Sequence, residues 1–185
     1  MSKILYLGTS KIDITPEKPV PLAGFDTRNG SFQGIRKRLY ARCWLFRQAS
    51  ETGKTNQALF VQADLIWWGT DRVDALRRRI LQEHGVDGVV LHASHTHSGP
   101  QTSDLFVPSL GVVDDAYIRT LEQKLLRGIA AAKANLEPVT VELGTGSCRI
   151  GIHRRKCVDG KIRMKPDGAG AIDPDVTVVR FARPD

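Results

Sequence analysis

The hydrophobic positions along the chain predict six strands and two helices. We expect strands at residues 4–14, 38–48, 58–68, 88–93, 139–148 and 175–182, where apolar side chains alternate or form short continuous runs. Apolar residues recur at helical spacing at Val73, Leu76 and Ile80, so a helix is expected over 71–84, ending at Gly85. A second helix is expected from Asp114 to about Asn135. Residues 16–34, with three prolines, form a long loop, which is more often functional than not in a compact domain.

These elements predict an α/β fold, with a mixed sheet that contains at least one βαβ unit and is flanked by helices. The unit consists of strand 58–66, helix 71–84 and strand 88–93, and its crossover is expected to be right-handed. Strand 88–93 (GVVLHA) is apolar on both faces, which is typical of a central parallel strand. No composition shift marks a linker, so residues 1–185 are predicted to form a single domain.

The composition is that of an ordinary globular protein, with 41% hydrophobic and 25% charged residues. No apolar run approaches the length of a transmembrane helix, and the apolar stretch Ile4–Leu7 is too short for a signal peptide, so we expect a cytoplasmic protein. The net charge of +7 comes with only 6% aromatic residues and no recognisable module, so nucleic acid is not an expected partner. The three cysteines are odd in number and lack CxxC spacing, which favours structural thiols.

The most informative stretch is LHASHTHSGP, residues 91–100, which holds three of the five histidines. In open α/β sheets, ligands gather beyond the carboxyl ends of the strands, where this stretch begins. If the backbone stays extended, His95 and His97 point to the same side and supply part of a zinc site, which needs three protein ligands when catalytic. His97 can instead bind substrate or relay a proton. His92 lies within the strand and is interpreted as structural, whereas His153 is ambiguous.

Several blocks in the same order resemble the neutral/alkaline non-lysosomal ceramidase family. HTHSGP is one of them. The others are GTSKIDITPEKPVPLAGF near the start, GIRKRLYARCWLF, FVQADL, GIHRRK and DPDVTVVRF. Together they extend over nearly the whole chain, which resembles the N-terminal part of the family's catalytic domain.

The resemblance implies a zinc-dependent hydrolase of a linear amide bond, which cleaves the N-acyl bond of ceramide to sphingosine and fatty acid in sphingolipid metabolism. It implies that His95 is a zinc ligand and that His97 lies beside the zinc-bound water or the substrate. Arg154 would hold the developing oxyanion or the substrate oxygens, and Gly24 and Phe25 would lie near the site entrance. Asp64 would be a supporting carboxylate.

The resemblance also implies further zinc ligands (a histidine, a glutamate and a tyrosine) in segments that have no match in this chain. The isolated chain is therefore expected to be incomplete as an enzyme, with a small-molecule N-acyl amide or lipid as its substrate. The alternative is a non-catalytic fragment or binding module that has the same fold and no closed metal site. The substrate and the oligomeric state are not given by the sequence.

Overall fold

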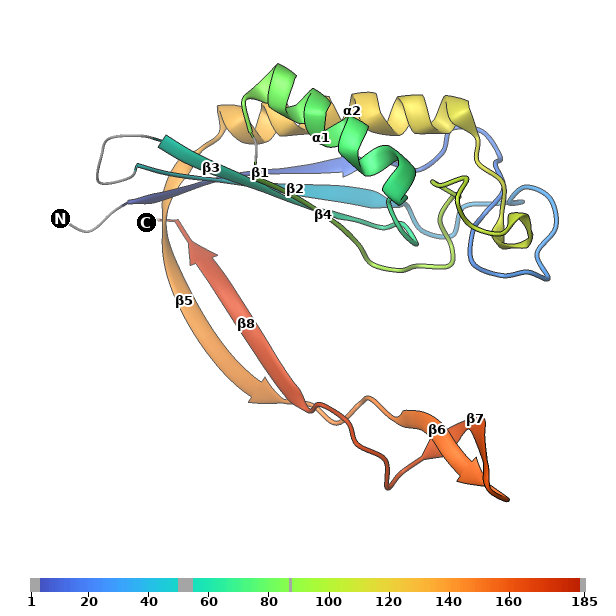
Figure 1. Cartoon of the computed structure of the whole chain (residues 1–185). Coiled ribbons are helices and arrows are strands. Elements are labelled where there is room, and N and C mark those ends of the chain that lie inside the picture. The colour runs from blue at the N-terminus through green and yellow to red at the C-terminus, as the bar shows by residue number, and fades with distance from the viewer. Residues whose placement is uncertain (1–3, 50–54, 87, 184–185) are drawn as a thin grey trace. The chain divides into compact units, whose positions relative to one another are not determined.

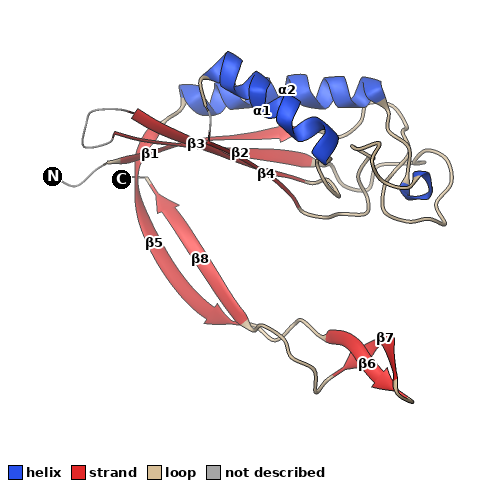
Figure 2. Cartoon of the chain, viewed as in Figure 1, coloured by secondary structure: helices blue, strands red, loops and turns tan. Residues whose placement is uncertain are grey.

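The computed structural model describes residues 4–49, 55–86 and 88–183. The chain divides into two compact units, Met1–Pro138 and Val139–Asp185, which are described separately. The secondary structure is mostly strand, with two long helices (Figure 2). A mixed sheet with flanking helices is thus confirmed as the broad fold class, although the chain is richer in strand than expected. The prediction of one domain over residues 1–185 stays a prediction.

The first unit contains a mixed sheet with the strand order β4-β3-β2-β1. Its strands are β1 (Leu5–Asp13), β2 (Tyr40–Ala49), β3 (Thr55–Ala63) and β4 (Gly88–Ala93). The first three are antiparallel neighbours, whereas β4 runs parallel to β3. Helix α1 (Thr70–His84) lies between β3 and β4 in the chain, and α2 (Asp115–Ala134) follows β4. Both helices cover the same face of this sheet (Figure 1).

Each helix has a cap at a residue that the sequence predicts, α1 at its C-terminus and α2 at its N-terminus. Gly85 adopts the left-handed conformation with φ of 69°, and its N–H donates to the Leu81 carbonyl at 2.9 Å, which closes α1. The Asp114 side chain accepts a hydrogen bond from the backbone N–H of Tyr117 at 2.7 Å and caps the start of α2. These caps fix the lengths of the two helices that cover the sheet.

The core lies between the helices and the alternate residues of the strands that face them. Leu45, Leu59 and Val61 are fully buried there, together with Leu125 and Ile129 of α2. Burying a side chain of this size stabilises the fold by roughly 1.5–3 kcal/mol. A Cβ at Gly128 would clash with Ile12 of β1, so the glycine lets α2 approach the sheet closely.

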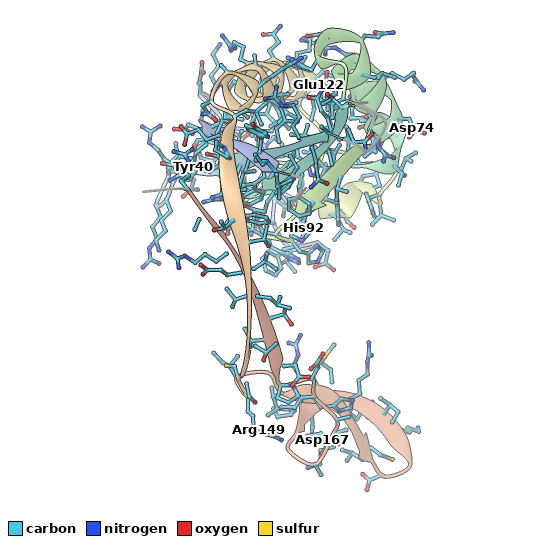
Figure 3. The ribbon with its side chains drawn as sticks, turned by 90° about the vertical axis from the view of Figure 1, so that its left-hand side faces the viewer. Tyr40, Asp74, His92, Glu122, Arg149 and Asp167 are labelled. Atoms are coloured by element: carbon cyan, nitrogen blue, oxygen red, sulfur yellow. The ribbon has the colours of Figure 1, made fainter. Side chains whose placement is uncertain are left out.

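Two expectations for the strands are wrong. Strand β4 is not central: among the described residues it pairs only with β3, and Val90 is 54% exposed. His92 also lies exposed on the sheet face opposite the helices (Figure 3). The strand expected at 58–68 begins at Thr55 and ends at Ala63, because Asp64 turns its carboxylate to the Tyr40 backbone N–H and the chain leaves the sheet. The sequence ETGKTNQ (51–57) also predicts a turn, of which residues 51–54 lie outside the described residues.

The second unit consists of two antiparallel ladders. Strand β5 (Glu137–Ser147) pairs with β8 (Asp175–Ala182), and β6 (His153–Val158) forms a hairpin with β7 (Lys161–Asp167) through Asp159-Gly160. The sequence predicts a connection where this hairpin lies, because basic side chains interrupt any apolar alternation in HRRKCV. Figure 3 labels Arg149, just before β6, and Asp167, at the end of β7.

Among the residues that the structure describes, no helix is long and apolar enough to cross a membrane.

The three cysteines should differ sharply in reactivity. Cys43 is buried in β2, and burial raises the pKa of its thiol to about 11, whereas Cys148 and Cys157 are exposed. We expect a thiol reagent to modify two cysteines rapidly in the native protein and the third only after unfolding, because the thiolate is the reactive form. Stopped-flow labelling with an aromatic disulfide at mildly alkaline pH measures this. Rapid modification of all three would contradict the burial of Cys43.

Asp13 should make folding sensitive to acid. Hydrogen bonds from Thr15, with the neighbouring Arg38 guanidinium, hold the pKa of Asp13 at about 2, below its ordinary value of 3.8. A lowered carboxyl pKa stabilises the fold above the ordinary value, and this stability is lost as the pH falls through that value toward the folded pKa. We expect Asp13→Asn to lower the free energy of unfolding near neutrality by at most about 1 kcal/mol, because the side chain is a third exposed.

The difference in free energy of unfolding between the Asp13→Asn variant and the parent should narrow between about pH 5 and about pH 2, because Asp13 of the parent loses its charge over this range. Urea unfolding at a series of pH values measures it. A gap that stays constant over this range would show that the Asp13 charge has no effect on folding.

Candidate functional site

The segments that leave β3 and β4 run side by side beyond the ends of the regular strands. The Ser94 N–H donates to the Ala63 carbonyl at 3.0 Å, and the Thr96 N–H donates to the Leu65 carbonyl at 3.2 Å. Because β3 and β4 are parallel, both segments emerge at the same edge of the sheet. Residues 94–97 are therefore held against residues 63–66.

His95 is oriented by a carbonyl group from the neighbouring segment. Its Nδ1 lies 2.9 Å from the Ile66 carbonyl oxygen. A carbonyl can only accept, so Nδ1 carries the proton and Nε2 presents its lone pair. A histidine that ligates a metal characteristically has its other ring nitrogen bonded in this way. His95 thus has the tautomer and the fixed orientation of a ligand.

The local conformation that places the two histidines differs from the expected one. An extended backbone is expected at this position from the sequence, but His95 has φ of 60°, in the left-handed region that few non-glycine residues adopt. The two rings nevertheless lie together, with their centroids 5.1 Å apart and nearly perpendicular. The turn at His95, rather than strand alternation, brings them side by side.

His97 packs against the long loop between β1 and β2. Its ring contacts Phe25 edge-on at 4.9 Å between centroids, and a Cβ on Gly24 would lie 2.6 Å from its Nδ1. The Arg28 guanidinium donates to the His97 carbonyl at 2.8 Å and lies over the Phe25 ring. Nδ1 is buried and has no hydrogen-bond partner in the described part of the chain, which leaves Nε2 as the nitrogen that can meet a ligand.

The remaining candidates lie elsewhere. His92 stacks on Phe60 of the neighbouring strand, with centroids 5.9 Å apart, as a structural residue of the sheet surface would. The Asp64 carboxylate bonds to the Tyr40 N–H at 2.9 Å and to the Gln62 amide at 3.2 Å, so it stabilises the β2–β3 edge rather than supporting either histidine. His153 and Arg154 begin β6 in the second unit, and the role of Arg154 stays a prediction.

A group of residues near the His95 ring was not predicted from the sequence. The Trp67 ring lies 6.3 Å from the His95 ring and stacks on Phe106 at 3.8 Å. Its indole N–H donates to the Oε1 of Gln101 at 2.6 Å, and Gln101 is buried. Gln101 follows Pro100 in a polar run, so the hydropathy of the sequence does not predict that its side chain is buried. The position of Trp67 near the end of a predicted strand is the one sequence feature that could have suggested the contact between them.

The described residues supply a partial set of metal ligands. No group of three or more histidine, cysteine, aspartate or glutamate side chains lies close enough together to hold a metal ion in that part of the chain. His95 offers Nε2 with its second nitrogen already bonded, which suits zinc. His97 lies beside it. The pair would therefore supply one or two of the three protein ligands that a catalytic zinc site needs.

The comparisons with known proteins agree with the sequence resemblance. The family model for neutral/alkaline non-lysosomal ceramidase, N-terminal, matches residues 5–158. The neutral ceramidase of Pseudomonas aeruginosa is 28% identical over 94% of this chain. The crystal structure of neutral ceramidase from Pseudomonas aeruginosa matches 99% of the chain with a TM-score of 0.79 and 24% identity. A structure of ceramidase complexed with C2 matches 98% with a TM-score of 0.78 and 24% identity.

These relatives are much longer than this chain. It spans 27% of the neutral ceramidase sequence, and 30% and 29% of the two crystallised chains. The two structures share the fold with this chain, and the family model covers most of its length. The chain belongs to the neutral/alkaline non-lysosomal ceramidase family, of which it carries the N-terminal region.

Proposed function

We propose that this chain contributes the first part of the active site of a zinc-dependent hydrolase, which cleaves the N-acyl amide bond of a ceramide-like lipid. The observation that carries the proposal is the 2.9 Å bond between His95 Nδ1 and the Ile66 carbonyl, which leaves Nε2 free to coordinate. Membership of the ceramidase family supplies the substrate class.

In this proposal His95 would hold zinc through Nε2. Zinc, when bound, lowers the pKa of a coordinated water to about 7 and polarises the amide carbonyl. The Ile66 carbonyl fixes the tautomer and the angle of the His95 ring, so no reorientation is needed on binding. Trp67 and its stack with Phe106 place an apolar surface near the His95 ring.

His97 is the proposed proton carrier. Water adds its oxygen to the carbonyl carbon and gives up one proton, the C–N bond breaks, and the leaving nitrogen takes that proton. The second proton of the water passes from the new carboxylic acid to the amine, so the products are a carboxylate and an ammonium ion. Nε2 of His97 can hold and return the first proton, because Nδ1 is enclosed against Gly24. Arg154 is proposed to stabilise the charge that develops on the carbonyl oxygen.

Zinc binding tests the proposed role of His95. We expect His95→Ala to weaken zinc binding by about tenfold or more, since loss of even a supporting contact to a ligand commonly has an effect of this size. His92→Ala is the matched control, because His92 lies on the exposed face of β4 and stacks on Phe60. Competition with a chromophoric chelator measures both. Equal zinc affinity in the parent and in His95→Ala would exclude His95 as a ligand.

Hydrolysis of a fluorescent N-acylsphingosine tests the reaction. Because the described residues hold only part of a ligand set, the assay is made on this chain joined to the remaining residues of the Pseudomonas aeruginosa neutral ceramidase. There we expect activity that is lost with a chelator, restored by zinc and abolished by His95→Ala. Zinc binding without hydrolysis would favour a binding module, whereas hydrolysis that is indifferent to chelator would contradict the zinc mechanism.

A substitution at Gly24 tests whether the absence of a side chain there determines the position of the His97 ring. Gly24→Ala would force a methyl group to within 2.6 Å of the His97 ring at a backbone φ of 107°. Gly30→Ala is the matched control, since Gly30 also has positive φ, at 75°, but has nothing within 4 Å of the added Cβ. Alanine in such a conformation alone costs roughly 1–2 kcal/mol.

We expect Gly24→Ala to lower the free energy of unfolding by more than Gly30→Ala and to shift the His97 ring resonances, which Gly30→Ala should leave in place. Urea unfolding and histidine NMR measure the two effects. Identical losses with unshifted His97 resonances would show that Gly24 does not determine the position of His97.

A further inference from the structure

We infer that the first unit has a second ligand site, which binds a single-chain anionic amphiphile of the fatty carboxylate class. It is a pocket of about 420 Å³ on the side of the 94–100 segment that Thr96 and Ser98 line, and neither His95 nor His97 is among its lining residues. Its size lies within the range of pockets that hold small molecules. The inference is independent of the proposed zinc chemistry.

The walls of the pocket are apolar and held in place by backbone hydrogen bonds. The Phe32 N–H donates to the Val20 carbonyl at 3.1 Å, and the Leu39 N–H donates to Thr15 Oγ1 at 2.9 Å. An isolated antiparallel β-bridge joins Leu22 to Pro100, at the end of the 94–100 segment. The apolar lining comprises Pro16, Leu22, Phe32, Ile35 and Leu39. These contacts come from separate parts of the chain, so the pocket is built into the fold.

The polar part of the lining is cationic. Arg36 and Lys37 line the pocket, and neither forms an ion pair with any residue in the described ranges. The neighbouring Arg38 differs, because it is paired with Asp13. Among the described residues, the pocket lining contains no acidic side chain. Within that part of the chain, Arg36 and Lys37 of the basic cluster 36–38 have no acidic partner, and they lie beside an apolar surface.

Apolar walls beside two cations favour binding of an alkyl chain that ends in an anionic group. Burial of the ligand's methylene groups against the apolar walls favours binding. Arginine and lysine form charge-assisted hydrogen bonds with a carboxylate, and the Thr96 and Ser98 hydroxyls add donors at the same pocket. A polyanion such as nucleic acid would use the cations but not the apolar walls. A neutral lipid would use the walls but not the cations.

Calorimetric titration with decanoate, in zinc-free buffer with chelator, tests the inference on the 185-residue chain. We expect saturable binding of one decanoate, with much weaker binding of acetate, which lacks the chain, and of 1-decanol, which lacks the charge. Absence of decanoate binding would overturn the inference. Binding of 1-decanol equal to that of decanoate would also overturn it, because the cations would then have no role.

A pair of double variants localises the site. Arg36→Gln with Lys37→Gln should weaken decanoate binding by about tenfold or more, since two charge-assisted contacts are lost. Arg78→Gln with Arg119→Gln removes the same charge from exposed positions on α1 and α2 and should leave binding within about twofold. Thermal unfolding shows whether each variant is folded. Equal losses in both pairs would indicate a general charge effect and contradict the assigned site.

Discussion

The site depends on the hydrogen bonds that continue the parallel pairing of β3 and β4 beyond the ends of the strands. Ser94 and Thr96 donate to the carbonyls of Ala63 and Leu65, and the ring of His95 extends the same series by bonding to Ile66. Because the ring bonds to a carbonyl of a segment that these backbone hydrogen bonds hold in place, the orientation of the His95 imidazole is set by the edge of the sheet. The left-handed turn at His95 and the position of His97 follow from this arrangement.

The loop between β1 and β2 encloses the histidine segment from the other direction. Ala23 donates to the Gly99 carbonyl at 2.9 Å, so Gly24 and Phe25 lie against His97, while Leu22 and Phe32 form walls of the neighbouring apolar pocket. The loop between β1 and β2 therefore lies against two surfaces of the HTHSGP segment. The proposed catalytic pair occupies one surface and the inferred carboxylate site the other.

Much of the fold was predictable because local physical signals agreed with the tertiary structure. Apolar spacing indicated α1 and α2, and Gly85 and Asp114 marked helix ends that their hydrogen bonds confirm. The hairpin of β6 and β7 was missed because exposed basic strands carry no hydrophobic alternation. The turn at His95 was missed because no glycine or asparagine marks a positive φ at that position, and Trp67 and Gln101 were missed because their contact joins distant segments.

Nitrogen NMR of the histidine rings tests the central claim most directly, since it reports which ring nitrogen carries the proton. At a pH where an ordinary imidazole is neutral, the account predicts that His95 is the Nδ1–H tautomer, held by the Ile66 carbonyl. Added zinc should then shift the His95 Nε2 resonance and leave Nδ1 protonated. An Nε2–H tautomer, or a His95 ring that does not respond to zinc, would contradict the account.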